Sequence, residues 1–101
     1  MFIRTVTVTI PADREAEIFA FWQWASAIVK QQPGYIRGRL WRDVSNPRRF
    51  TEVHEWEREE DSNAYRAIEQ FREVIERLVA LSVTQPQAMG YTVVRANTPE
   101  L

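Results

Sequence analysis

The chain has 101 residues, the size of one domain, with 45% hydrophobic residues, 27% charged residues and a formal net charge of −1. This balance excludes a disordered chain and argues against a nucleic-acid partner, because a nucleic-acid binder presents a basic face. The lack of cysteine excludes disulfides, thiolate nucleophiles and cysteine metal sites, and a single histidine cannot build a histidine-rich centre. We therefore expect one domain over residues 1–101 with no metal site.

The amino-terminal half predicts a strand followed by a helix. Phe2 to Ile10 alternates β-branched residues at period two, and Pro11 closes this strand. Asp13 is the expected N-cap of a helix that runs to about Gln31. Two apolar stripes at helical spacing follow this helix, Ile18–Trp22–Ala25–Val29 and Phe21–Trp24–Ile28.

The carboxy-terminal half predicts a hairpin, a second helix and a last strand. Tyr35 to Asp43 alternates, Ser45–Asn46–Pro47 is a turn, and Phe50 to Trp56 forms the third strand. A helical stripe then runs through Tyr65, Ile68, Phe71, Ile75, Leu78 and Ser82, and Gln85–Pro86 ends that helix. Gly90 to Ala96 is the expected last strand, followed by a polar tail from Asn97 to Leu101.

The resulting order, βαββαβ, predicts an α+β fold of the ferredoxin-like kind. Right-handed crossovers give a four-stranded antiparallel sheet with two helices on one face. The other face is left uncovered and carries Tyr35, Arg37, Arg39 and Trp41. Since an apolar patch of this kind usually marks an interface, we expect a homodimer.

No apolar run approaches the roughly 20 residues that a membrane-spanning helix needs. Met1 to Arg4 also begins directly with a strand pattern rather than a signal sequence. We expect a cytoplasmic protein without a membrane partner.

Three short motifs give the chain a family resemblance. Gln32–Tyr35 (QPGY) closes a helix, Asn46–Phe50 (NPRRF) leads from the turn to the third strand, and His54–Glu57 (HEWE) ends that strand, followed by Phe71 in a helix. This pattern resembles the antibiotic biosynthesis monooxygenase (ABM) family, which has the dimeric α/β-barrel fold. The resemblance implies two protomers packed sheet against sheet, each with a ligand cavity beside the third strand and second helix.

The resemblance carries over to single positions only in part. Trp56 matches the tryptophan of cofactor-free members that oxidise polyketide-derived phenols, whereas their asparagine is Glu52 here and their tyrosine is Ser62. Ile75 stands where haem-degrading members carry an axial histidine. The resemblance therefore implies an enzyme without haem, and we expect no cofactor.

The third strand carries the candidate catalytic residues, His54 and Trp56. His54 is the only side chain that titrates near neutrality when unperturbed, so it is a candidate general base; a structural histidine bonded to a carboxylate or to Arg39 is the alternative. Glu52, His54 and Trp56 share one strand face by parity. Trp56 is expected to form the pocket wall.

The candidate ligand-binding residues are Glu52 of the third strand and one residue from each of three other predicted elements, Arg39, Tyr65 and Trp22. Arg39 is expected either to clamp an anionic oxygen or to pair with Glu52 across the hairpin. Tyr65 is expected to offer a hydroxyl from the second helix, and Trp22 to pack in the core or line the pocket.

The sequence thus favours an oxidoreductase, a cofactor-independent monooxygenase acting on an aromatic, polyketide-like small molecule. Two alternatives keep the same fold: a non-catalytic small-ligand-binding or stress-associated dimer, and a cyclase or isomerase that works by acid–base chemistry. Fold alone does not decide among them.

Overall fold

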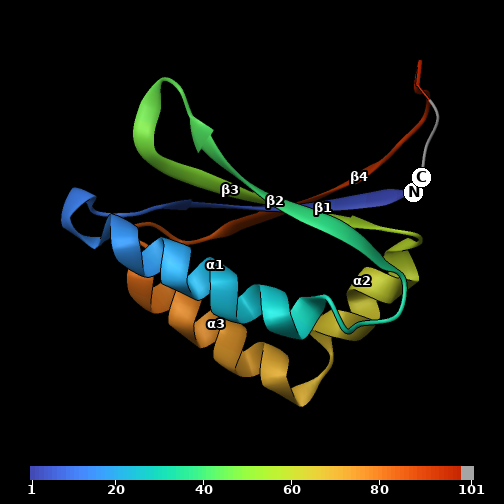
Figure 1. The fold of residues 1–101 in the computed structure, drawn as a ribbon, viewed down its shortest axis with the longest axis horizontal. Helices are drawn as coiled ribbons and strands as arrows, with labels where there is room; N and C mark the ends of the chain where they lie inside the picture. The colour runs from blue at the N-terminus through green and yellow to red at the C-terminus, as the bar shows by residue number, and fades with distance from the viewer. Residues whose placement is uncertain (99–101) are drawn as a thin grey trace.

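A computed structural model describes residues 1–98 and shows one antiparallel sheet with helices packed against one face (Figure 1). The elements in chain order are β1 (Phe2–Thr9), a short 3₁₀ turn (Ala12–Arg14), α1 (Glu15–Val29), β2 (Tyr35–Asp43), β3 (Asn46–Trp56), α2 (Glu59–Arg66), α3 (Glu69–Leu81) and β4 (Gln87–Thr92). The four strands lie in the order β2-β3-β1-β4, which confirms the ferredoxin-like fold.

The first helix begins later than its sequence suggests. Asp13 lies in the 3₁₀ turn and does not cap α1; the residue before the helix is Arg14, which makes no side-chain capping bond. Arg14 instead pairs with Glu17 one turn into the helix. The expected N-cap was therefore wrong, because the chain enters the helix through a tighter turn.

The hairpin between β2 and β3 is shorter than expected. Asp43 pairs with Asn46, so only Val44 and Ser45 form the connection. Pro47 lies inside β3 and not in a turn. Its carbonyl oxygen accepts a hydrogen bond of 2.8 Å from Arg42.

The predicted second helix is two helices, separated at Ala67 and Ile68. Ile68 is extended (φ −72°, ψ 153°), and this break lets Tyr65 of α2 and Phe71 of α3 pack edge to face at 5.0 Å. In α3 the buried stripe is Val74, Leu78 and Leu81, whereas Ile75 is 36% exposed. Tyr65, Ile68, Phe71 and Leu78 of the predicted stripe do face the core, whereas Ile75 and Ser82 give way to the neighbouring Val74 and Leu81.

The last strand lies nearer to α3 than predicted. Leu81 ends α3, and Gln87–Thr92 pairs with β1, Phe2 opposite Thr92 and Thr7 opposite Gln87. Gly90 to Ala96 was therefore placed too late, because the pairing with β1 and not local propensity sets this register. The expected tail lies partly outside the described residues.

A bulge between Tyr35 and Arg37 divides the residues that alternation had put on one face of β2. Tyr35 turns toward the helices and packs edge to face on Trp56, with ring centroids 4.9 Å apart. Arg37 and Arg39 stay on the uncovered face. The predicted grouping of Tyr35 with the two arginines was wrong for this reason.

The core lies between the sheet and the helices. One buried cluster joins Val8 and Phe50 of the sheet to Ile18 of α1 and Leu78 of α3. A second cluster, Phe2, Val29, Trp56 and Tyr65, lies toward α2. Within residues 1–98 no helix has the length and apolar character to cross a membrane.

Candidate functional site

A cavity of about 220 Å³ lies between the sheet and the helices. Trp22 and Val29 of α1 line it, together with Trp56 of β3, Tyr65 of α2 and Phe71 of α3. Its walls are mainly apolar, with a few polar groups directed inward, as in most small-molecule sites. Glu52, His54 and Trp56 all line this cavity, which confirms their predicted common face.

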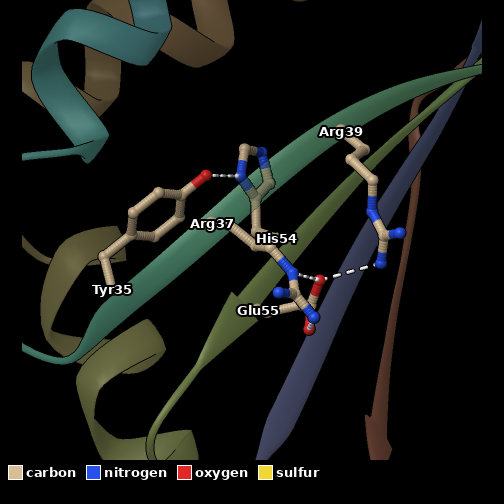
Figure 2. A network of polar contacts seen from close by, with 5 residues as sticks. All are labelled: Tyr35, Arg37, Arg39, His54 and Glu55. Atoms are coloured by element: carbon tan, nitrogen blue, oxygen red, sulfur yellow. Dashed lines mark hydrogen bonds and ion pairs between the residues drawn. The ribbon is translucent and has the colours of Figure 1, made fainter. Parts of the chain in front are cut away.

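His54 is held on three sides. Its Nδ1 lies 3.0 Å from the hydroxyl oxygen of Tyr35, and its Nε2 lies 3.5 Å from a carboxylate oxygen of Glu52 (Figure 2 shows the tyrosine contact). The ring of Trp22 stacks on the imidazole at 5.7 Å with an interplanar angle of 22°. The imidazole is therefore fixed in orientation while one edge stays at the cavity.

Gly38 makes this arrangement sterically feasible. It lies opposite His54 across the β2–β3 pair, and a Cβ at this position would come within 2.2 Å of the Tyr35 hydroxyl and 3.2 Å of His54 Nδ1. A side chain here would displace the tyrosine from the histidine. The glycine thus keeps room for the contact that orients His54.

Glu52 is 5% exposed and lies beside His54 at the inner face of β3. Burial, and then the negative charge of Glu52, raise the pKa of Tyr65 to about 12. The Tyr65 hydroxyl consequently keeps its proton at neutral pH and is available as a hydrogen-bond donor. The cavity thus combines a carboxylate, an imidazole and a neutral phenol.

Trp56 is 1% exposed and stands between two tyrosines. Besides the Tyr35 contact, its ring lies 5.7 Å from that of Tyr65 at an interplanar angle of 32°. Trp56 is therefore both a core residue and part of the cavity wall. Trp22 is half-buried, lines the cavity and belongs to neither buried cluster, so of its two expected roles the structure shows the pocket lining.

Arg39, the remaining sequence candidate, is not among the cavity residues. It lies on the opposite face of the sheet, where its guanidinium and that of Arg37 contact the Glu55 carboxylate at 2.8 and 2.7 Å (Figure 2). Glu55 is 2% exposed. The strand register places Arg39 opposite Val53, and its side chain reaches Glu55 on the uncovered face and not Glu52, because successive side chains of β3 point to opposite faces.

Five polar residues at the cavity were missed as site candidates: Arg4, Ser26, Ser62, Arg66 and Gln85. Arg4 Nε lies 3.4 Å from the Ser62 hydroxyl, and its NH2 lies 3.3 Å from the side-chain oxygen of Asn63. The sequence did contain a signal for Arg4. It interrupts the apolar phase of Phe2, Val6 and Val8, so a charged side chain had to face the helices.

Within residues 1–98, no three histidine, cysteine, aspartate or glutamate side chains are grouped so as to hold a metal ion. The functional groups of the cavity are organic acids and bases lining an aromatic pocket. Fold and site together define a ferredoxin-like protein with an imidazole and a carboxylate side by side in a largely apolar cavity.

The family model for antibiotic biosynthesis monooxygenases matches residues 1–77, and the chain belongs to this family. The matched segment runs from β1 into α3 and contains His54, Glu52, Trp56 and Tyr65. No curated protein matches the chain.

Solved structures show the same fold. A candidate antibiotic biosynthesis monooxygenase from Deinococcus radiodurans is 20% identical, with 99% of each chain covered and a TM-score of 0.84. SnoaB, a cofactor-independent oxygenase from Streptomyces nogalater, is 21% identical, with 98% of this chain and 96% of that one covered and a TM-score of 0.79. A candidate family member from Bordetella bronchiseptica is 22% identical over 93% and 98%, with a TM-score of 0.80.

Proposed function

We propose that the protein is a cofactor-independent monooxygenase that oxidises an aromatic, polyketide-like phenol in the cavity beside Trp56. The observation that carries this proposal is the position of His54, fixed between Tyr35 and Glu52 at the edge of an aromatic pocket. Membership of a monooxygenase family and the fold shared with a cofactor-independent oxygenase support it. The fold likeness is an analogy and does not by itself assign the activity.

His54 is the proposed general base. With its proton on Nδ1 donated to the Tyr35 oxygen, Nε2 is the nitrogen that accepts the phenolic proton. The imidazolium formed then has the Glu52 carboxylate 3.5 Å from Nε2. The new N–H at Nε2 thus finds a carboxylate oxygen nearby as a hydrogen-bond acceptor.

The phenolate formed is the reductant of oxygen. A phenol with a free ring carbon takes one oxygen atom as a quinone carbonyl, while the second oxygen leaves as water with two protons from the substrate. All the electrons that reduce oxygen come from the substrate, so the balance needs no external reductant. Trp56 would hold the ring and exclude water, and the neutral Tyr65 hydroxyl would donate to the developing anionic oxygen.

A homodimer is part of this proposal. The uncovered sheet face, visible on the far side of the helices in Figure 1, exposes about half of Trp41, Met89 and Tyr91. Beside them lies the Glu55 carboxylate, clamped by two arginines. A second copy of this face would cover the aromatic and apolar groups.

Oxygen uptake with a panel of phenols and naphthols tests the activity. We expect consumption with the parent protein and a loss of turnover of about 100- to 10,000-fold in His54→Gln, with ligand affinity nearly unchanged. Arg72→Gln, an exposed site on α3 away from the cavity, is the matched control. Full turnover in His54→Gln would rule out the histidine as base.

Two other results would assign the alternative functions. A new product without oxygen consumption would identify a cyclase or isomerase that uses the same acid–base pair. Tight binding of phenols without any product would identify a ligand-binding protein.

A further inference from the structure

We infer that the cavity takes an aromatic molecule that carries a carboxylate, and that Arg4 and Arg66 hold this carboxylate. This inference narrows the substrate class of the proposed monooxygenase. The statement that such a molecule is oxidised rests on the proposed function, whereas the statement that it binds does not. Both arginines are among the residues that line the same cavity as Trp56 and His54.

Among the residues that the structure describes, Arg4 and Arg66 form no ion pair with a carboxylate, unlike most of the arginines. Within residues 1–98, seven other arginines form an ion pair shorter than 4 Å with an aspartate or glutamate: Arg14, Arg37, Arg39, Arg42, Arg49, Arg58 and Arg77. Arg4 instead contacts two neutral acceptors, the Ser62 hydroxyl and the Asn63 amide oxygen, at 3.4 and 3.3 Å. These contacts orient its guanidinium without neutralising the charge.

The electrostatic environment of Arg4 favours an incoming anion. Burial, followed by the positive charge of Arg66, lowers the pKa of Arg4, and the charge of Glu59 offsets this only in part. A partly buried cation beside a second cation is a costly arrangement that a carboxylate would relieve. Arginine is also the residue best suited to bind a carboxylate through two parallel hydrogen bonds.

The charge of the cavity lining matches a singly charged group. Arg4 and Arg66 supply positive charge, and Glu52 is the one carboxylate among the lining residues that the structure describes. The net charge of these three side chains is therefore positive, and one bound carboxylate would balance it. A doubly charged phosphate would add repulsion from Glu52.

The strand register places the proposed carboxylate-binding residue Arg4 beside the proposed base His54. Arg4 of β1 and His54 of β3 are directly paired partners, so their side chains are neighbours on the inner face of the sheet. A carboxylate at Arg4 would therefore hold an attached phenol ring next to His54 and against the aromatic wall. This geometry explains why a charged residue stands in the otherwise apolar phase of β1.

Calorimetric titration with a hydroxynaphthoic acid and the corresponding neutral hydroxynaphthamide tests the inference. The parent protein should bind the acid at least about tenfold more tightly than the amide, since a charge-assisted hydrogen bond contributes more than a neutral one. Arg4→Gln and Arg66→Gln should each remove about tenfold of acid affinity and leave amide affinity unchanged. Arg72→Gln should change neither.

Three results would overturn the inference: equal affinity of the parent for acid and amide, equal weakening of both ligands in Arg4→Gln, or the same loss in Arg72→Gln. Arg66→Gln, at an exposed helical position, keeps the test valid if Arg4→Gln does not fold. The experiment measures binding only. Acid-selective binding without oxygen consumption would therefore refute the proposed reaction and retain the carboxylate-binding role of Arg4 and Arg66. Oxygen consumption with neutral phenols alone would retain the reaction and refute that role.

Discussion

The hydroxyl oxygen of Tyr35 lies 3.0 Å from Nδ1 of His54, at the point where a bulge turns the start of β2 toward the helices. Burial, with smaller contributions from Tyr65, Glu52 and Glu55, raises the pKa of Tyr35, so the phenol stays neutral beside the histidine. The tyrosine thereby fixes the imidazole ring without charging it. This contact occupies Nδ1, and Nε2, the other ring nitrogen, lies 3.5 Å from a carboxylate oxygen of Glu52.

Tyr35→Phe should lower the free energy of unfolding by about 1–2 kcal/mol, because the partly buried Nδ1 of His54 loses its partner. Urea denaturation with an unchanged m-value would show this loss. Tyr91→Phe is the control, since the Tyr91 hydroxyl contacts only the Met89 sulfur at 3.5 Å among the described residues. A Tyr35→Phe protein as stable as its parent would contradict the prediction.

Trp56→Ala should destabilise the protein by about 3–5 kcal/mol, because a large, fully buried ring leaves a cavity. Phenol binding should weaken in the same variant, since the aromatic wall is lost. Trp56→Phe keeps an aromatic ring and should cost less in both measurements. Chemical denaturation and calorimetric titration check the pair, and a loss below about 1 kcal/mol in Trp56→Ala would show that the ring is not part of the core.

The stability of the protein should fall as the pH rises from about 10 to about 12. The pKa of Tyr65 is raised to about 12 in the folded state, so between these values the folded chain holds a proton that the unfolded chain has released. Unfolding is then favoured by each increase in pH. Tyr65→Phe should show a shallower decrease in denaturation experiments over this range, and an identical slope in the two proteins would disprove the assignment.

Sedimentation at micromolar concentration should give twice the chain mass of 11.9 kDa. Trp41→Glu, on the uncovered sheet face, should shift the protein toward monomer, because a charge would be buried in the interface. Val83→Glu changes an exposed residue outside the strands and should leave the dimer intact. A parent protein that sediments as a clean monomer would refute the dimer.

Haemin should produce no sharp, stoichiometric Soret shift. The family resemblance puts Ile75 where haem-degrading members carry their axial histidine, and His54 is already engaged by Tyr35 and Glu52. A stoichiometric shift that disappears in His54→Ala would show the prediction to be wrong.

The sequence by itself determined the element order, the ferredoxin-like topology and the common face of Glu52, His54 and Trp56. These features depend on local periodicity: alternation at period two fixes which side chains of one strand share a face, and a helical stripe fixes which side of a helix is buried. The family resemblance was likewise readable in residues close together in the chain, and the family model confirms it.

The tertiary structure alone decided which residues from different elements meet. The pairing of β2 with β3 decides two contacts. Its bulge brings Tyr35 to His54, and its register lets Arg39 contact Glu55. The helix break at Ile68 depends on tertiary packing. Arg4 and Arg66 line one cavity although they lie about 60 residues apart in the chain. Such relationships arise because register, bulges and helix breaks are selected by contacts between distant segments, which no local pattern encodes.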